Sequence, residues 1–383
     1  MYELLVPSAA GIEGVVKLQL KRLGYGDCKA DNGRTSVFGD FYTIARLNMF
    51  LRSGERVLLV VGKFPCVTFD ELYEGVYALP WEQFLTSHSL VNVNCKTVKS
   101  QLFAYSAIQK ISKKAIVDKM LSRSHKEMAE DGARCIVEVN INNDFAVVTI
   151  DTSGDGLHKR GYRDLAYTAP IKETTASALI DLSVMRRDKQ FVDLFCGSGT
   201  LPIEVAMREC CIAPGLQRTF DYCDWECVPK DCYEKSVVEA KDSIKLLPNL
   251  DIRGYDINPE AISISRRHAK RAGVDFVKFE VADMREFKSV TPYGVMISNV
   301  PYGERLSDEQ EVLPLYKDLG KLYKTLPDWN FYILTAQLDF EKYFGKWASK
   351  KRKLYNANIE CCYYAFNGNP PPKSNNFTKD TID

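Results

Sequence analysis

The chain has 383 residues, of which 45% are hydrophobic and 26% are charged, so it is long enough for two or three globular domains and is not disordered as a whole. Its 51 Lys and Arg against 50 Asp and Glu give a formal net charge of +1, so an anionic partner must meet a local basic patch. The sequence lacks an apolar run of about 18 residues and a basic segment leading into an apolar one at its start, which argues against a membrane span or secretion signal. We therefore expect a cytoplasmic protein with no membrane partner.

Twelve cysteines are scattered along the chain, as expected for reduced thiols in a cytosolic protein. The tightest group is Cys223, Cys227 and Cys232, which has neither a nearby histidine nor a second closely spaced cysteine pair. A zinc site usually needs such ligands. We therefore predict no metal, and a cysteine-only site is the alternative.

The first half of the chain mixes helical and strand patterns. Residues 1–65 contain a helical pattern at 11–26 and an apolar strand-like run at 55–64, which predicts a small α+β region. Residues 66–155 contain two further helical patterns and three strand-like runs, two of them joined at the polar turn Asn142-Asn143-Asp144. These residues predict a second α+β module.

After a connecting segment at 156–175, strands and helices alternate over 176–366, which predicts an α/β domain with a mostly parallel sheet. Its expected strands lie at 190–195, 251–257, 274–283, 293–299 and 331–336, followed by a closing antiparallel pair within 351–366. Residues 367–383 are rich in proline and asparagine, and we expect a flexible tail there.

The first expected strand of this domain ends in the motif "DLFCGSGT", which spans residues 193–200. Gly197 and Gly199 allow a tight turn and close approach of a ligand to backbone N–H groups, so we predict a cofactor site. A dinucleotide site would need a third glycine and a strand-end acidic residue about 20 positions further on, but the third glycine is absent and the next strand-end acid is Asp256, well beyond that spacing. The strand-end carboxylate of Asp193 indicates a ligand that carries a cation.

S-adenosylmethionine is such a ligand, and further carboxylates end the next two expected strands. Asp256 can accept both ribose hydroxyls, while Asp283 can accept from the adenine amino group with Met284 packed on the ring. The alternative for each aspartate is a helix N-cap.

The fourth expected strand ends in "SNVPYG", where the Asn299 side-chain oxygen and the Val300 carbonyl could accept both hydrogens of an exocyclic amine. Tyr302, after Pro301, could stack on a flipped base. We therefore predict that these four residues form an amine-methylation site. An ordinary strand-ending turn is the alternative.

The chain resembles the bacterial THUMP-domain RNA methyltransferases that modify guanine N(2) in 23S ribosomal RNA, with tRNA guanine-N(2) enzymes as close relatives. The resemblance spans nearly the whole chain, and its most specific part is the ordered series "LHKRGYR", "APIKETTA" and "CGSGT". It implies a ferredoxin-like α+β region at 1–65, a THUMP RNA-binding domain at 66–155 and a Rossmann-like class I S-adenosylmethionine-dependent methyltransferase domain at 176–366.

The resemblance also implies which residues hold the cofactor: Asp193, Gly197, Gly199, Asp256 and Asp283, with Thr168, Pro170 and Lys172 covering it. We add Cys196, Ile257, Met284 and Asn299, which adjoin these positions or belong to the same strand ends. One departure matters, since the family usually has proline where this chain has Val300. The carbonyl remains, but the fixed φ of proline is lost and an N–H appears, which puts preorganisation of the base in question.

Two basic stretches are candidates for RNA contact. Residues 95–130 carry eight Lys and Arg against three Asp and Glu, and Lys110, Lys113 and Lys114 are spaced to share a helical face. The "LHKRGYR" stretch adds Lys159, Arg160 and Arg163. Phosphate contacts there could position RNA while the catalytic pocket selects the base. An ordinary solvated face is the alternative.

The predicted activity is methyl transfer to guanine N(2), with 23S rRNA or the assembling large ribosomal subunit as the partner. A tRNA substrate, DNA adenine-N(6) methylation and a non-catalytic RNA-binding protein remain open alternatives. The sequence does not identify the modified nucleotide or the oligomeric state.

Overall fold

The computed structural model describes residues 1–124, 127–165, 170–245, 247, 249–289, 291–302, 309–356 and 359–370. Two compact units divide these residues, and neither is continuous in sequence. Unit 1 contains Met1–Arg163, Glu173–Ala178 and Cys210–Leu246, and unit 2 contains the rest. Thr168 and the tail beyond residue 370 lie outside the described residues.

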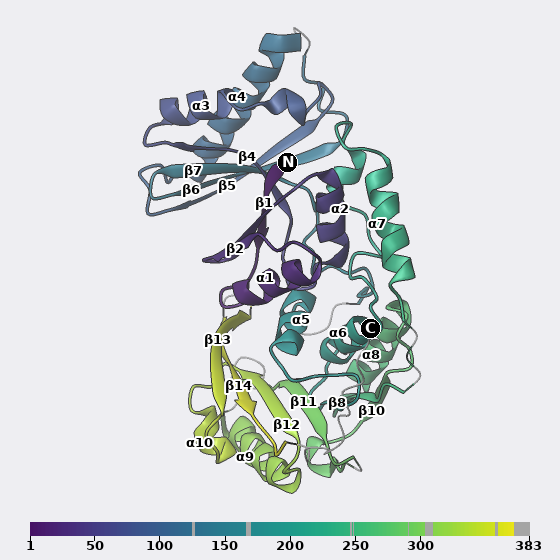
Figure 1. The fold of residues 1–383 in the computed structure, drawn as a ribbon. Coiled ribbons are helices and arrows are strands. Elements are labelled where there is room, and N and C mark those ends of the chain that lie inside the picture. Colours follow the sequence, from purple (N-terminus) through teal and green to yellow (C-terminus); the bar gives the residue numbers. More distant parts are fainter. Residues whose placement is uncertain are drawn as a thin grey trace, which may run out of the picture. The chain divides into compact units, whose positions relative to one another are not determined.

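Unit 1 is built on a seven-stranded sheet with the strand order β2-β3-β1-β4-β7-β6-β5 (Figure 1). Its strands are β1 Tyr2–Pro7, β2 Cys28–Asp31, β3 Arg34–Gly39, β4 Leu58–Pro65, β5 Leu90–Val98, β6 Arg134–Asn142 and β7 Phe145–Asp151. Its helices are α1 Glu13–Arg22, α2 Phe41–Phe50, α3 Phe69–Tyr77, α4 Tyr105–Ser124 and α7 Asp231–Asp242, together with the 3-10 turns Trp81–Gln83 and Asp221–Asp224 and most of α5 Glu173–Asp181. The predicted α+β patterns are thus confirmed.

Local sequence signals explain several element boundaries in unit 1. Thr68 and Glu71 form a reciprocal capping box at the start of α3, and the Asp40 side chain accepts from the Thr43 N–H at the start of α2. The turn between β6 and β7 places Asn143 and Asp144 at φ 50° and 60°, a left-handed conformation that these residue types tolerate. The predicted hairpin therefore forms at its polar turn.

Unit 1 also includes Cys210–Leu246, a segment inside the range expected for the catalytic domain. Helix α7 packs against α2, where the Arg46 Nε and Nη2 atoms both lie 2.7 Å from carboxylate oxygens of Glu239. Such two-point pairs fix orientation as well as charge.

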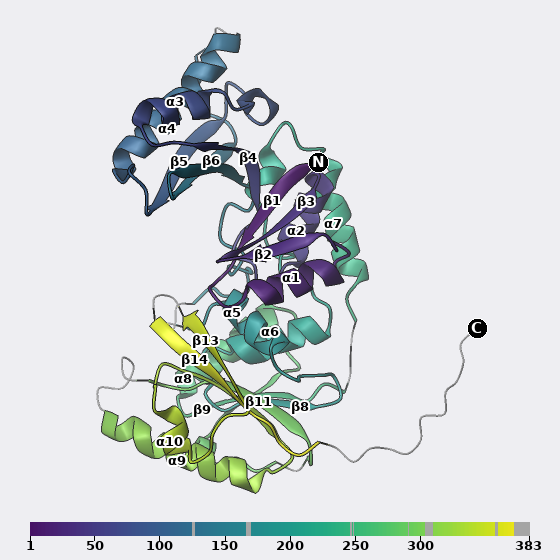
Figure 2. The same ribbon diagram turned by 60° about the vertical axis from the view of Figure 1, so that its left-hand side comes forward.

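Unit 2 contains the alternating strands and helices. The sheet order is β10-β9-β8-β11-β12-β14-β13, and β14 runs antiparallel to both neighbours (Figure 2). The strands are β8 Gln190–Asp193, β9 Ile252–Asp256, β10 Lys278–Val281, β11 Gly294–Asn299, β12 Asn330–Thr335, β13 Lys350–Asn356 and β14 Ile359–Phe366. The helices are α6 Thr200–Glu209, α8 Pro259–Arg271, α9 Glu309–Thr325 and α10 Phe340–Phe344, with a 3-10 turn at Met284–Glu286. This topology confirms the predicted Rossmann-like class I methyltransferase fold.

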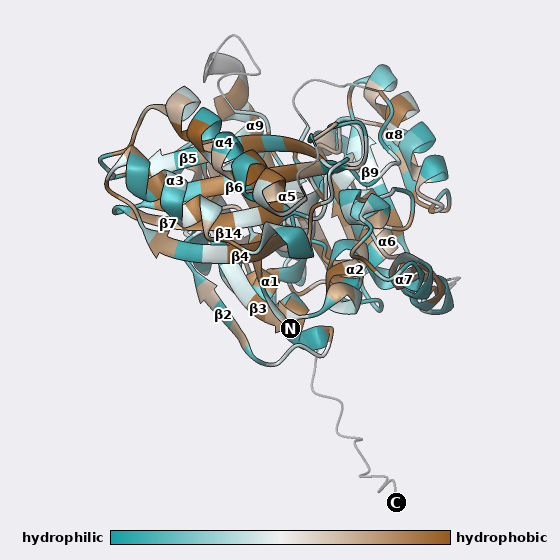
Figure 3. Ribbon diagram, turned by 90° about the horizontal axis from the view of Figure 1, so that it is seen from above, coloured by the Kyte–Doolittle hydropathy of each residue, from teal (hydrophilic) through white to brown (hydrophobic). Residues whose placement is uncertain are grey.

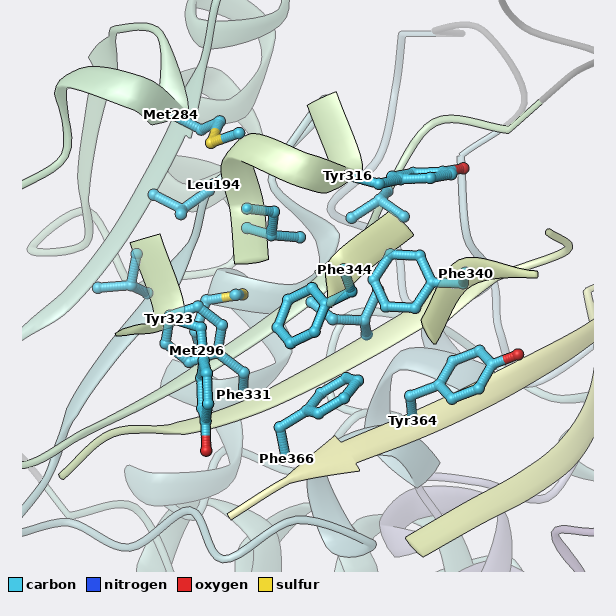
Figure 4. Packing of buried hydrophobic residues seen from close by; sticks show 14 of the residues in the cluster. Leu194, Met284, Met296, Tyr316, Tyr323, Phe331, Phe340, Phe344, Tyr364 and Phe366 are labelled. Carbon is cyan, nitrogen blue, oxygen red and sulfur yellow. The ribbon is translucent and has the colours of Figure 1, made fainter. Parts of the chain in front are cut away.

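An aromatic core supports β11, β12 and β14 (Figure 4). The rings of Phe344 and Phe366 lie 4.2 Å apart, and Phe340 adds a further ring 5.4 Å from Phe344. Helix α8 buries one side against the sheet while exposing charged residues, and Figure 3 shows both hydrophilic and hydrophobic residues along it. This packing fixes the strand ends that carry the candidate site.

Candidate functional site

Chemically active side chains gather at the carboxyl edge of the unit 2 sheet. Asp193 ends β8, Asp256 ends β9, Asn299 ends β11, and Asp283 follows β10. These four strands are parallel neighbours in the sheet. Because ligands of open α/β sheets bind outside the carboxyl ends of the strands, these residues form the candidate site.

Asp193 is almost fully buried, with 2% of its surface exposed. Its Oδ1 accepts a hydrogen bond from the Ser298 hydroxyl at 2.7 Å and from the Phe195 N–H at 3.1 Å. Burial nevertheless raises the pKa of Asp193 to about 7, and the negative charge of Asp256 adds to the rise. A cationic ligand would favour the ionised carboxylate.

The glycine loop after β8 turns tightly enough to face β9. Gly197 and Gly199 have φ values of 50° and 83°, and the Cys196 N–H donates to the Tyr255 carbonyl. A Cβ atom at Gly199 would lie 2.8 Å from the Ser265 Cβ, so no larger residue fits beside α8. The loop brings the start of α6 and its backbone N–H groups to the sheet edge.

The Cys196 thiol is buried in this loop, and burial raises its pKa well above the usual range. A neutral thiol is a weak nucleophile. Cys196 therefore lines the loop as an apolar group rather than a reactive one.

Asp256 holds the loop from the next strand. Its Oδ2 accepts from the Gly197 N–H and its Oδ1 from the Asn258 N–H, both at 2.9 Å. The cap of α8 is Asn258 rather than Asp256, which removes the capping alternative for Asp256. Beside it, Ile257 is 71% exposed, so an uncovered apolar side chain adjoins the carboxylate.

Asp283 differs from the other two aspartates because it does cap a turn. Its side chain accepts from the Arg285 N–H at 2.9 Å, and it lies 3.5 Å from the Arg285 guanidinium. Met284 is 2% exposed and belongs to the aromatic core (Figure 4). The adenine contacts expected for both residues stay predictions.

Asn299 presents an unusual polar atom. Its Oδ1 is buried and accepts no hydrogen bond from any described residue. An unsatisfied buried acceptor costs about 1–3 kcal/mol, and such atoms need a structural or functional reason. The preceding residue, Ser298, donates its hydroxyl hydrogen to Asp193. The Asn299 amide is therefore adjacent in the chain to the residue that binds the Asp193 carboxylate.

Val300 continues the strand where the family usually has proline. Its N–H donates to the Leu334 carbonyl of β12 at 3.2 Å, and its side chain is fully buried. The N–H that the valine introduces is therefore satisfied rather than left to interfere with a base. The following Pro301 carbonyl accepts from the Tyr316 hydroxyl at 2.7 Å, which anchors the turn.

Tyr302 is 3% exposed, so a base could stack on it only after the groups that cover it move. In the connecting segment, Pro170 is half-buried and Lys172 is exposed. Their contacts with the cofactor stay predictions. The contact expected for Thr168 also stays a prediction, because that residue lies outside the described residues.

The predicted RNA-binding residues fall into two groups in unit 1. On α4, Lys110 and Lys114 are exposed, while the Lys113 Nζ lies 2.7 Å from a Glu130 carboxylate oxygen. In the second stretch, Lys159 is exposed on its side chain and pairs with Asp155 at 3.0 Å.

The other two residues of that stretch are less open. Arg160 is 2% exposed, and its guanidinium donates to the Leu157 and Arg52 carbonyls, so it holds the loop and cannot meet RNA on an open surface. Arg163 lies 3.3 Å from Glu173.

The site contains residues that the sequence did not single out. Ser298 precedes Asn299 in the strand, and a serine next to a strand-end amide is a weak signal in sequence alone.

Across the described ranges, no three His, Cys, Asp or Glu side chains are grouped to hold a metal ion. Every helix within those ranges is too short or too polar to span a bilayer.

Comparison with known families accounts for almost the whole chain. The RlmL ferredoxin-like domain matches residues 3–58, the THUMP domain matches 66–151, and the RMKL-like methyltransferase domain matches 160–365. The predicted family is thus confirmed.

Two relatives match nearly all of the chain. The "Putative RNA methyltransferase YpsC" of Bacillus subtilis is 40% identical over 369 residues, covering 95% of this chain and 96% of that protein. The "Ribosomal RNA large subunit methyltransferase K/L" of Syntrophotalea carbinolica is 31% identical over 370 residues, covering 92% of this chain. The alignment covers 51% of that protein, so the chain spans about half its length.

Solved structures give the same picture. SMU.472, described as a putative methyltransferase complexed with SAH, is 42% identical with a TM-score of 0.92, and the match covers 96% of this chain and 98% of that one. A protein of Listeria monocytogenes described as a predicted N6-adenine-specific DNA methylase is 42% identical with a TM-score of 0.91, over 96% of each chain. From these matches and the strand-end geometry, the chain belongs to the RMKL-like methyltransferase family.

Proposed function

We propose that the chain is an S-adenosylmethionine-dependent RNA methyltransferase that acts on the exocyclic N(2) of a guanine in 23S rRNA. Its THUMP domain and the names of two relatives support RNA as the substrate, and the relative named for the large ribosomal subunit supports 23S rRNA. The observation that carries the choice of an amine target is the Oδ1 of Asn299 at the end of β11, which is buried and has no hydrogen-bond partner among the described residues.

The residues at the sheet edge fit the cofactor that this fold binds. Asp193 is a buried carboxylate whose ionised form a cation would stabilise, and the exposed Ile257 side chain offers an apolar surface beside Asp256. When bound, S-adenosylmethionine supplies an electrophilic methyl group on a sulfonium. Asp193 and the glycine loop would hold its amino-acid portion, and Asp256 its ribose.

Asn299 would bind the target base through the hydrogens of its amine. An exocyclic amine on a purine is a poor nucleophile, because its lone pair is delocalised into the ring. Acceptance of its hydrogens by the amide oxygen and the Val300 carbonyl would orient the nitrogen and favour a pyramidal geometry. The hydrogen bond from Val300 to β12 and the anchor at Pro301 keep these acceptors in place before the base arrives.

The decisive experiment is single-turnover methylation by Asn299→Ala and Asn299→Asp. We expect Asn299→Ala to lower the methyl-transfer rate about 100-fold or more, the scale of one preorganised catalytic group, while RNA and cofactor affinities stay near wild type. Asn299→Asp keeps an acceptor and should retain part of the rate.

Thermal melting of each variant is the control for folding. A folded Asn299→Ala enzyme with the wild-type rate would disprove the proposed role. If both variants melt early instead, the amide is a structural element of the turn, which is the competing explanation.

The name of the Listeria protein favours one alternative, methylation of adenine N(6) in DNA. The same two acceptors could hold either exocyclic amine, so the strand end does not decide between them. Incorporation of labelled methyl groups into 23S rRNA, tRNA and duplex DNA, each offered separately, distinguishes the substrates. Label in duplex DNA alone would overturn the proposal, and label in tRNA alone would keep the chemistry but change the partner.

A further inference from the structure

Unit 1 contains a half-open pocket of about 570 Å³ next to the loop that follows β7. Its walls come from the stretch 155–163 and from Glu173, Arg218 and Thr219, which are distant in sequence. Four lining side chains are Lys or Arg, and two are carboxylates, so the walls carry an excess of positive charge. Because the whole chain has a net charge of only +1, this excess is a local feature.

Arg218 lines the pocket and binds the loop that forms part of its wall. Its guanidinium donates to the Gly156 and Asp155 carbonyls, both at 2.6 Å, and to the Lys159 and Ser153 carbonyls at 3.0 and 3.3 Å. The Nε atom donates to the Thr219 carbonyl at 3.5 Å, so all five N–H groups bond carbonyls. These bonds fix the loop, and because a carbonyl carries no net charge, Arg218 contributes positive charge to the pocket without offering a free N–H donor. Burial lowers the pKa of Arg218 to about 10, which still leaves it protonated at neutral pH.

Lys159 also lines the pocket, and its side chain can bind an incoming anion. The Lys159 Nζ lies 3.0 Å from Asp155 Oδ1, and the two side chains are 60% and 64% exposed. Exposed pairs of this kind contribute only about 0–1 kcal/mol, so an incoming anion can replace Asp155 as the partner at little cost. His158 also lines the pocket, with its Nδ1 3.7 Å from a Glu55 oxygen.

We propose that this pocket binds a phosphate group of the RNA substrate, with Lys159 and Arg218 supplying the charge. The Lys159 ammonium can donate to phosphate oxygens directly, while the Arg218 guanidinium, whose N–H groups all bond carbonyls, attracts the anion by its charge. The volume exceeds that of one phosphate, which leaves room for the sugars on either side. This inference rests on the proposed function, since it takes the phosphate from RNA.

The test uses the pair Lys159 and Asp155, because their substitutions have opposite expected signs. Lys159→Gln should weaken binding of a 23S rRNA transcript about fivefold or more at low salt and reduce the slope of log affinity against log salt by about 0.7–0.9. Asp155→Asn removes a repelling charge and should tighten binding about two- to fivefold. Cofactor affinity should not change in either variant.

Unit 1 offers a matched control. Lys235 and Asp231 form another i, i+4 pair, with side chains 62% and 47% exposed and their charged atoms 2.7 Å apart, and neither lines the pocket. Lys235→Gln and Asp231→Asn should leave RNA affinity and its salt slope at wild-type values. Equal effects from both pairs would mean that any surface charge matters, and would overturn the proposal.

Titration of inorganic phosphate into the same variants, measured by calorimetry, shows whether the pocket binds an RNA phosphate or free phosphate. Weaker RNA binding by Lys159→Gln, tighter binding by Asp155→Asn and competition by phosphate would support an RNA phosphate. Altered phosphate binding with unchanged RNA binding would overturn RNA as the source, and no effect on either would overturn the pocket. If the wild-type protein fails to bind RNA at all, the proposed function fails, while the phosphate titration still reports on the pocket.

Discussion

Ser298 links the two parts of the candidate site at the level of single atoms. Its hydroxyl donates to Asp193 Oδ1 and accepts from the Leu194 N–H at 3.1 Å. The next residue, Asn299, carries the amide oxygen that no described residue bonds. One short side chain thus joins the end of β8 to the end of β11. A change in the charge of Asp193 would therefore alter the hydrogen bonds of Ser298, the residue next to the amine-binding position.

The raised pKa of Asp193 gives a prediction about stability and pH. The carboxyl has a pKa of about 7 in the folded protein against an ordinary value of 3.8, so the folded state binds more protons between these pH values. Stability then falls as pH rises from about 4 to about 7. Asp193→Asn keeps an oxygen that can accept from Ser298 and Phe195, and should lose this part of the pH dependence.

The measurement is chemical unfolding of the cofactor-free wild type and Asp193→Asn at several pH values. The variant should gain stability relative to wild type as pH rises, by at most a few kcal/mol at neutral pH. If the difference between the two proteins is the same at pH 4.5 and pH 7.5, Asp193 does not titrate as proposed.

At the scale of elements, the loop between β8 and α6 depends on contact with α8. Gly199 has a φ of 83°, and a Cβ there would meet the Ser265 Cβ at 2.8 Å and the Phe279 ring at 3.0 Å. Gly199→Ala should therefore lower the free energy of unfolding by about 1–3 kcal/mol and weaken cofactor binding, because both strain and overlap act on the loop.

Gly273→Ala is the matched control for this loop. Gly273 also has a positive φ, of 72°, but an added Cβ would meet no atom of the described residues within 4 Å. Its substitution should cost only the strain and leave cofactor affinity unchanged. Denaturant unfolding with a cofactor titration compares the two variants, and equal losses of affinity would show that the α8 contact is unimportant.

The sequence predicted the elements well because apolar runs and their turn residues are local signals. Asp193, Asp256 and Asn299 could be assigned to strand ends, since each ends an apolar, strand-like run. The expected α/β fold then implies which of these strands are neighbours in the sheet. Contacts between distant segments gave no such signal. Arg160 belongs to a basic stretch typical of an open face, yet its guanidinium is buried. Similarly, four of the five carbonyls that bind Arg218 lie about sixty positions earlier in the chain.

At the scale of the whole molecule, the two units carry different candidate tasks. The cofactor carboxylates lie in unit 2, while the exposed lysines of α4 and the basic pocket lie in unit 1. Because the net charge is +1, RNA affinity must come from these local groups and should respond strongly to salt. The two binding activities should then be separable by mutation.

The last prediction tests this separation with one change in each unit. Asp256→Ala should weaken S-adenosylmethionine binding about 10- to 100-fold, which corresponds to about 1.5–3 kcal/mol for a charge-assisted bond to a ribose diol, and leave RNA affinity intact. Replacing Lys110 and Lys114 together by Gln should weaken RNA binding and lower its salt slope by about 1.5, with unchanged cofactor affinity. Lys113→Gln should have a smaller effect, since Glu130 already neutralises that ammonium.

Asp256 also accepts the Gly197 N–H, so its replacement could loosen the loop instead of removing a ligand contact. Asp256→Asn keeps one acceptor oxygen, which can still take the Gly197 N–H, while the bond from the Asn258 N–H is lost. It separates the two effects, because it should keep the glycine loop at a small cost in melting temperature while losing the charge-assisted part of the affinity. Calorimetry for the cofactor and filter binding for RNA give both affinities for every variant. A loss of RNA affinity in Asp256→Asn, or of cofactor affinity in the α4 variants, would show that the two tasks are coupled and that the assignment of one task to each unit is wrong.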